Sequence, residues 1–130
     1  MTPENERRLR TKHPQLFAGP RGKAALVPFA VDGFAVGDGW ATILDEMAAE
    51  IERSCVRTGS KLPTVLQIKE KFGLLRVYID GGVEGVDTII ARAEERSAVT
   101  CEDCGKPGRL RRKGWLRTLC DEHDAPSRRA

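Results

Sequence analysis

Apolar residues recur at helical spacing in two segments of the chain. Between residues 39 and 56 they fall three or four positions apart, which places them on one face of a helix. This apolar face consists of Trp40, Ile43, Leu44, Met47, Ile51 and Cys55. Asp38 is a favourable N-cap, so we expect the helix to begin directly after it. A second amphipathic helix is predicted over residues 86–97, with an apolar face of Val86, Ile89, Ile90 and Ala93.

Between these helices the pattern changes to the alternation that is typical of strands. Two runs of β-forming residues, 65–71 and 74–79, predict a β-hairpin with Gly73 in or beside its turn. Alternation would direct one apolar set to the core: Leu66, Ile68, Leu75, Val77 and Ile79. A two-stranded hairpin is marginal in water by itself, so this face should pack against the two helices. The predicted fold class is therefore α+β, with two amphipathic helices packed on a β-hairpin.

The first part of the chain is more polar. Residues 3–12 predict a short helix that begins after Thr2 and ends at His13, because a residue that precedes proline avoids the helical region. Glycine and proline recur through residues 18–39, which predicts loops around a few apolar anchors. We expect three units: a polar N-terminal arm and loop (1–33), the α+β core (34–97) and a metal-binding finger (98–130).

The finger contains the most specific motif of the chain. Two residues separate Cys101 from Cys104, two separate Cys120 from His123, and fifteen lie between the pairs. This spacing allows three sulfurs and one nitrogen to surround one ion, which is the tetrahedral donor set of structural zinc sites. Gly105 fits the tight turn after the second cysteine. Because four protein ligands leave no open position for water, we predict one structural Zn²⁺ and no catalysis at this ion.

Other uses of the cysteines fit less well. A redox pair at Cys101 and Cys104 would not need Cys120 or His123, and three cysteines with one histidine suit zinc better than a common iron–sulfur cluster. Cys55 lies on an apolar stripe, where a buried free thiol is more plausible than a nucleophile. If the metal site folds separately, Cys104→Ser should unfold the finger and leave residues up to about 97 folded.

Composition and charge narrow the classes of partner only slightly. The 130 residues are 40% hydrophobic and 32% charged, with a formal net charge of +3. This composition is typical of a globular protein, and the small net charge neither requires nor excludes a nucleic acid. The apolar runs are too short to cross a membrane, and the polar start lacks a secretory signal. We therefore expect a cytoplasmic protein with no membrane partner.

The distribution of charge points to the segment between the two ligand pairs. It has no acidic residue and carries a candidate nucleic-acid surface of Arg109, Arg111, Arg112, Lys113, Trp115 and Arg117. A basic hairpin with an exposed aromatic ring can contact phosphates and stack on a base. The alternative is that Trp115 packs across the finger and the basic residues balance nearby acidic ones and the thiolates. The sequence leaves both readings open.

Recognisable catalytic patterns are missing. A nuclease of the HNH type needs a histidine base and further ligands, but of the two histidines His123 is a ligand and His13 stands before a proline. The His-x-Glu pattern of zinc deaminases and the glycine-rich phosphate loops are absent too. Nothing in the spacing pairs Glu70, Asp80 or Glu84. The sequence favours binding over catalysis and shows no small-molecule site.

Three motifs occur in a fixed order over residues 34–124. They are Gly37-Asp38-Gly39-Trp40, residues 67–78 with Lys-Glu-Lys-Phe-Gly at their centre, and residues 101–123 with Gly114-Trp115 and Thr118-Leu119-Cys120. In this order they resemble a group of small uncharacterised proteins that phages and prophages encode. The finger itself resembles treble-clef and zinc-ribbon fingers, with the departures that His123 replaces a cysteine and that only seven residues follow it. The resemblance implies a bacterial host cell and no particular activity.

The favoured function is therefore a non-enzymatic, zinc-binding accessory protein of phage type. It would bind a host or phage macromolecule, nucleic acid or protein, through the basic finger. Two alternatives stay open: an enzyme of unrecognised type with a site near the β-hairpin, and a purely structural zinc protein in a larger assembly.

Overall fold

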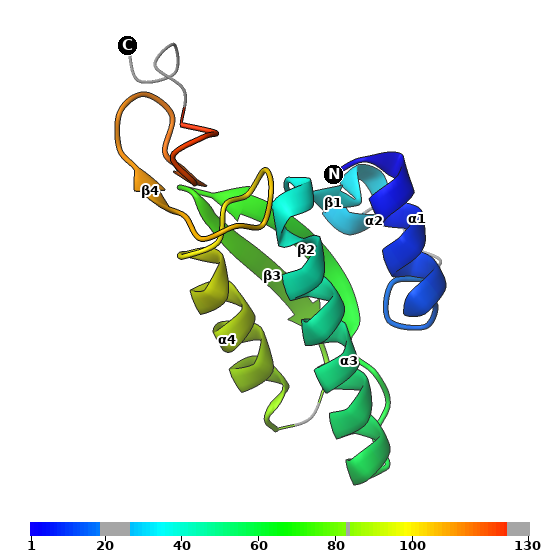
Figure 1. The fold of residues 1–130 in the computed structure, drawn as a ribbon. Helices are drawn as coiled ribbons and strands as arrows, with labels where there is room; N and C mark the ends of the chain where they lie inside the picture. Colours follow the sequence, from blue (N-terminus) through cyan, green and yellow to red (C-terminus); the bar gives the residue numbers. More distant parts are fainter. Residues whose placement is uncertain (19–26, 83, 125–130) are drawn as a thin grey trace.

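A computed structural model describes residues 1–18, 27–82 and 84–124, and the fold is mixed α+β. In chain order the elements are α1 (Pro3–Lys12), α2 (Pro28–Asp32), β1 (Phe34–Ala35), the 3-10 helix η2 (Asp38–Trp40), α3 (Ala41–Thr58), β2 (Thr64–Lys71), β3 (Leu74–Asp80), α4 (Val86–Ser97), β4 (Arg109–Arg111) and β5 (Arg117–Leu119). Within these ranges β1, β2 and β3 form one sheet in that order, and β4 pairs with β5. Helices α3 and α4 lie side by side on one face of the β2–β3 hairpin (Figure 1).

The two amphipathic helices form where the apolar spacing predicts them, but the first begins later than expected. Asp38 is not its N-cap, because Asp38 opens η2 and Trp40 is the residue that precedes α3. The Asp38 carboxylate instead accepts a hydrogen bond of 2.8 Å from the backbone amide of Thr2. This bond is the main cause that lowers the pKa of Asp38. Asp38 therefore joins the start of the chain to the loop before α3.

The β2–β3 hairpin contains a β-bulge that simple alternation does not reveal. The strand register shifts between Val65 and Gln67, so two residues of β2 face one of β3. Val65 and Ile68 are buried as a result, whereas Leu66, which we had assigned to the core, is only half-buried. The prediction for β3 is confirmed: the residues that contact the core are Leu75, Val77 and Ile79.

The outer edge of β3 is capped by side chains of α4. The backbone amide of Leu75 donates to the Ser97 hydroxyl at 3.0 Å, and that of Val77 donates to the Glu94 carboxylate at 3.1 Å. Unpaired amides on an edge strand invite pairing with another chain. Because α4 occupies these two donors, the edge of β3 is a poor template for an added strand.

The described part of residues 1–33 belongs to the core and is not a separate polar arm. Its helix α1 has the expected bounds, with the Thr2 hydroxyl as N-cap. Its buried apolar residues share one cluster with α3 and the sheet, and they are Leu9, Leu16, Phe17 and Phe29. Phe17 and Phe29 pack against Phe34 with ring centroids 5.0 and 5.2 Å away. Of the loop predicted over 18–39, α2 and β1 were missed, and residues 19–26 lie outside the described residues.

His13 fastens the end of α1 to α3. Its side chain is 3% exposed, and its Nδ1 and Nε2 atoms lie 2.5 Å from Glu52 Oε1 and 2.6 Å from Asp45 Oδ1. Lys12 Nζ is 2.8 Å from the other oxygen of Asp45. Two carboxylates of α3 thus hold the His13 ring, one at each ring nitrogen.

Asp45→Asn is expected to lower the free energy of unfolding by about 1–3 kcal/mol at neutral pH, because it removes charge-assisted hydrogen bonds. Burial raises the pKa of Asp45, but the bonds from Lys12 and His13 outweigh it, so the pKa lies below its usual value. A carboxyl with a depressed pKa stabilises the fold above the unfolded pKa of about 3.9 and loses this contribution as the pH falls.

Urea unfolding at several pH values tests this expectation. The difference between Asp45→Asn and the natural chain should be complete at pH 6 to 7. It should begin to shrink near pH 4 and disappear only as the pH falls through the lowered pKa of Asp45 in the folded chain. A difference that stays constant from pH 6 down to the acid unfolding of the chain would contradict the role given to the charged carboxylate. Lys12→Gln is the control, since Lys12 is 59% exposed and its ion pair should contribute less than about 1 kcal/mol.

Candidate metal centre

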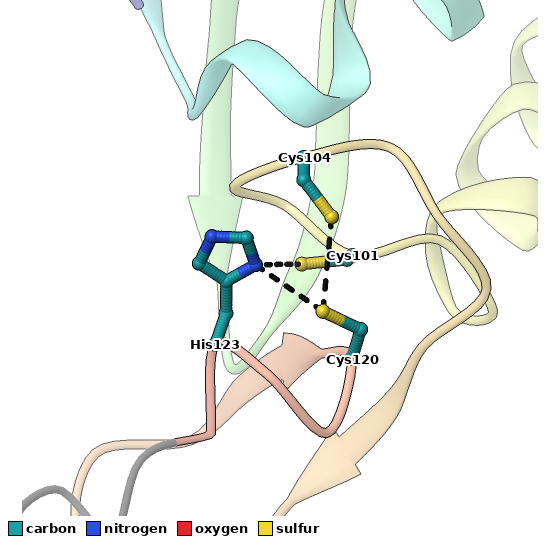
Figure 2. Close-up of side chains that lie close together, drawn as sticks. All are labelled: Cys101, Cys104, Cys120 and His123. Atoms are coloured by element: carbon teal, nitrogen blue, oxygen red, sulfur yellow. Dashed lines mark hydrogen bonds between the residues drawn. The ribbon is translucent and has the colours of Figure 1, made fainter.

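The four predicted ligands converge at the C-terminal end of the described chain. The sulfurs of Cys101, Cys104 and Cys120 and a ring nitrogen of His123 all lie within 4.8 Å of one another. Figure 2 shows a ring nitrogen of His123 directed at the sulfurs of Cys101 and Cys120, and the sulfur of Cys104 directed at that of Cys120. Among the described residues, no other group of His, Cys, Asp and Glu side chains meets in this way. The spacing argument therefore selected four residues that the fold brings together.

The separations of the donor atoms fit a tetrahedral ion. Bonds of about 2.3 Å to sulfur and about 2.1 Å to nitrogen require about 3.8 Å between sulfurs and about 3.6 Å between sulfur and nitrogen. The Cys104 and Cys120 sulfurs are 3.7 Å apart. His123 Nδ1 is 3.7 Å from the Cys101 sulfur and 3.2 Å from the Cys120 sulfur. The cluster is compatible with a metal site, and its donor set with zinc.

Backbone turns shape both ligand pairs. After Cys101 the chain turns back, so that the Gly105 amide donates to the Cys101 carbonyl at 2.9 Å and the Cys101 amide donates to the Lys106 carbonyl at 2.7 Å. Gly105 has φ of +82°, a conformation that side chains disfavour, which explains the glycine at this position. The Asp124 amide closes the second turn on the Cys120 carbonyl at 3.0 Å.

The second turn also favours a thiolate at Cys120. The backbone amide of His123 donates to the Cys120 sulfur and, together with the His123 ring, lowers the pKa of this thiol to about 6. A thiolate is the form that binds a metal ion. The hydrogen bonds from His123 therefore favour the thiolate of Cys120, which is the form that would bind a metal ion.

Hydrogen bonds with the loop before α3 and with the β2–β3 turn hold the finger against the core. The Gly39 amide donates to the Glu102 carbonyl at 2.7 Å, and the Gly37 amide donates to the Glu102 carboxylate at 2.9 Å. The buried indole of Trp40 donates to the Thr100 carbonyl at 2.9 Å. The Thr118 hydroxyl donates to the carbonyl of Gly73, in the β2–β3 turn, at 2.7 Å. The ligands therefore lie on a loop system that is continuous with the core.

Glu102 sits inside this contact and is buried. Burial raises the pKa of its carboxyl, against the Gly37 amide and the Arg117 guanidinium, which lower it, and the charge of Glu70 raises it further. The Oε2 atom of Glu70 is itself buried, with no hydrogen-bond partner among the described residues. Alternation could have indicated this, because Glu70 pairs with the buried Leu75.

Two of the six predicted nucleic-acid residues have structural roles instead. Arg111 is 8% exposed, donates two hydrogen bonds to the Leu119 carbonyl, and ion-pairs with Asp121 at 2.9 Å and Asp124 at 3.3 Å. Arg117 lies 2.6 Å from an oxygen of Asp103. These two arginines balance acidic side chains, as the alternative reading expects. They brace the β4–β5 hairpin on the loops that carry the ligands.

The other four members of the set lie on or beside the hairpin and are exposed: Arg109, Arg112, Lys113 and Trp115. Trp115 is 77% exposed and does not contribute to either buried hydrophobic cluster.

Elsewhere in the described chain, Cys55 is the buried free thiol that its apolar stripe indicates. No described helix is long and apolar enough to cross a membrane.

No protein-family model, no curated protein and no solved structure matches the chain.

Proposed function

We propose that the protein is a non-enzymatic accessory protein whose structural Zn²⁺ presents a basic hairpin to nucleic acid. Three thiolates and one neutral imidazole form a common structural zinc site, and the separations between donor atoms suit that ion. Cys101, Cys104, Cys120 and His123 would occupy all four positions, so the ion would have no site for a reacting water. Its contribution is to hold the two ligand loops together.

The observation that carries the proposal is the exposure of basic residues and of one aromatic ring on the finger. Arg109, Arg112 and Lys113 are exposed to solvent, and Trp115 is exposed too. Arg111 and Arg117 form ion pairs that brace the hairpin beneath them. Cations that neutralise phosphates and a ring that stacks on a base are the two elements of sequence-tolerant nucleic-acid binding. A rigid, braced hairpin lowers the entropy lost when such a surface binds.

The motif order supports a phage-type setting in a bacterial cell, and the two ligand turns around a β-hairpin support a treble-clef-like finger. Neither point is needed for the binding proposal. A protein partner at the same hairpin is the competing outcome of the experiment below.

Elemental analysis and salt-titrated fluorescence anisotropy with mixed-sequence DNA and RNA test the proposal. We expect one zinc per chain and an affinity that falls steeply with salt. The triple variant Arg109→Gln, Arg112→Gln, Lys113→Gln should lower the slope of log affinity against log salt by about 2 to 3, since each lost phosphate contact removes about 0.7–0.9.

The matched control removes three positive charges outside the finger, from Arg7, Arg8 and Arg53, which are exposed on α1 and α3. It should bind like the natural chain if the finger is the interface. Equal losses in both variants would show only a general charge effect and contradict a specific surface. One zinc per chain with no binding at low salt would overturn the proposal and direct the search to a protein partner.

A further inference from the structure

We propose that the nucleic-acid surface continues from the finger across the outer face of the β2–β3 hairpin, and that its ligand is single-stranded. This inference rests on the proposed function and adds the second half of the interface and the form of the ligand. The surface consists of Lys69, Lys71, Phe72, Arg76 and Tyr78, called the outer-face set below.

Strand register places these side chains on the face that the helices leave uncovered. Lys69 pairs with Arg76 across the strands, and Tyr78 pairs with Gln67. Neighbouring positions point the opposite way and are buried, as the pair of Ile68 and Val77 shows. Helices α3 and α4 lie on that buried side (Figure 1). Tyr78 is 42% exposed, so its ring is accessible from the solvent side.

The positive charge of this face favours an anionic partner. Like charges directly opposite each other on two strands are destabilising, yet Lys69 faces Arg76. The carboxylate of Glu94 is 3.9 Å from Arg76, at the limit of an ion pair, and already accepts the Val77 amide. A phosphate backbone would neutralise both cations at once. The charge pattern is thus complementary to a polyanion.

Two aromatic rings lie among these cations. The Lys69 ammonium is 5.7 Å from the centre of the Tyr78 ring, and the Lys71 ammonium is 5.9 Å from that of Phe72. Phe72 is 68% exposed and has φ of +53° in the hairpin turn. A turn of this kind favours Asn or Gly there, and a left-handed backbone costs other residues about 1–2 kcal/mol. An exposed phenylalanine in a disfavoured conformation indicates a binding role for the ring.

The outer-face set is continuous with the finger. Gly73, directly after Phe72, accepts the hydrogen bond from Thr118 and lies against Leu110 and Arg117. The turn of the β2–β3 hairpin therefore touches the β4–β5 hairpin, and Figure 1 shows the finger at this end of the sheet. One strand of nucleic acid can follow Tyr78, Phe72 and then the finger without leaving a basic surface.

The exposed rings select a single strand over a duplex. Side chains on an open sheet stack on bases that are unpaired and turned outward, whereas a duplex keeps its bases stacked inside. A protein strand added to the sheet is disfavoured, because Ser97 and Glu94 occupy two edge amides of β3. DNA and RNA single strands share the chemistry that this surface recognises.

Anisotropy with labelled 20-mers of deoxythymidine and of uridine, and with a 20-base-pair duplex, tests the inference on the full-length zinc-loaded protein. We expect both single strands to bind at least about tenfold more tightly than the duplex. Lys69→Gln with Arg76→Gln should lower the salt slope for single strands by about 1.4, since each contact contributes about 0.7. Arg7→Gln with Arg8→Gln removes the same charge from α1 and should leave the slope unchanged.

Substitutions of Tyr78 separate the contribution of ring stacking to the binding affinity from that of charge. Tyr78→Ala should weaken single-strand binding about tenfold, and Tyr78→Phe should restore it, because the ring and not the hydroxyl stacks. Zinc content and circular dichroism show whether each variant is folded. A preference for uridine over deoxythymidine would identify RNA as the ligand, and equal affinities would identify recognition through shared chemistry; both support the inference.

The outcomes separate this inference from the proposed function. Loss of binding in the finger variant, with normal binding in Lys69→Gln/Arg76→Gln and in Tyr78→Ala, would overturn the outer face as an interface and leave the finger as the site. Equal affinity for duplex and single strands would overturn the single-stranded ligand. No binding to any of the three probes would overturn both proposals.

Discussion

Removal of the proposed Zn²⁺ is expected to destabilise the whole chain and not only the finger. The finger forms buried and partly buried hydrogen bonds with the loop before α3 and with the β2–β3 turn, through Thr100, Glu102 and Thr118. If the ligand loops lose their ion, Trp40 and Gly73 lose these partners. This changes the expectation drawn from the sequence, in which residues up to about 97 stay folded after Cys104→Ser.

The size of the effect follows from two quantities. Structural zinc contributes about 10–16 kcal/mol of apparent binding free energy in isolated fingers. Single domains are stable by only about 5–15 kcal/mol in total. Loss of even a third of the metal contribution would therefore lower the melting temperature strongly, by more than about 10 °C for a chain of this size.

The two tryptophans allow a direct test. In a Trp115→Phe background, Trp40 is the remaining tryptophan, and its buried side chain reports on the core. We expect chelation of the metal, or Cys104→Ser, to shift the Trp40 emission to longer wavelength and to lower the unfolding temperature. An unchanged Trp40 signal with loss of metal would instead show that the core folds without its finger. Cys55→Ala is the matched control, since this buried cysteine is not a ligand and its replacement should retain one metal per chain.

The sequence allowed prediction of those features that depend on neighbours along the chain. Helical spacing located α3 and α4, alternation located β2 and β3, and ligand spacing located the metal cluster. The wrong predictions concern features that residues elsewhere in the sequence determine. The bulge after Val65 depends on the pairing of β2 with β3, and Asp38 accepts a hydrogen bond from Thr2 and does not cap α3. The prediction of a surface position for Arg111 is wrong for the same reason. Its buried ion-pair partner, Asp124, follows the second ligand pair and is distant from Arg111 along the chain.

The contacts of the finger give a physical reason for the first motif, Gly37-Asp38-Gly39-Trp40. Amides of Gly37 and Gly39 bind Glu102, the carboxylate of Asp38 binds Thr2, and the indole of Trp40 binds Thr100. Each of the four residues therefore connects the loop before α3 to another part of the chain. Spacing within the motif gave no sign of this, because every partner except Thr2 lies about sixty residues later.

Gly39→Ala is expected to be among the most damaging single substitutions outside the ligands. A Cβ atom at position 39 would lie 2.1 Å from the Cys101 carbonyl oxygen and 2.6 Å from the Glu102 carbonyl. Both obstacles are backbone, so no side chain can rotate away, and the finger must move off the core. We expect a loss of about 3 kcal/mol or more in the free energy of unfolding. Metal affinity should fall too, since the displaced segment carries the Cys101 ligand.

Gly59→Ala provides the matched control for this substitution. Gly59 ends α3 with φ of +66°, and a Cβ atom there would meet nothing within 4 Å. Its replacement should cost only about 1 kcal/mol of backbone strain and leave metal binding unchanged. Gly39 has no such φ, so any larger loss at position 39 comes from the close approach of the finger. Urea unfolding compares the stability of the two variants, and metal titration compares their metal affinity. If Gly39→Ala were no more harmful than Gly59→Ala, the finger could not be seated on the core as closely as the Gly39–Glu102 hydrogen bond requires.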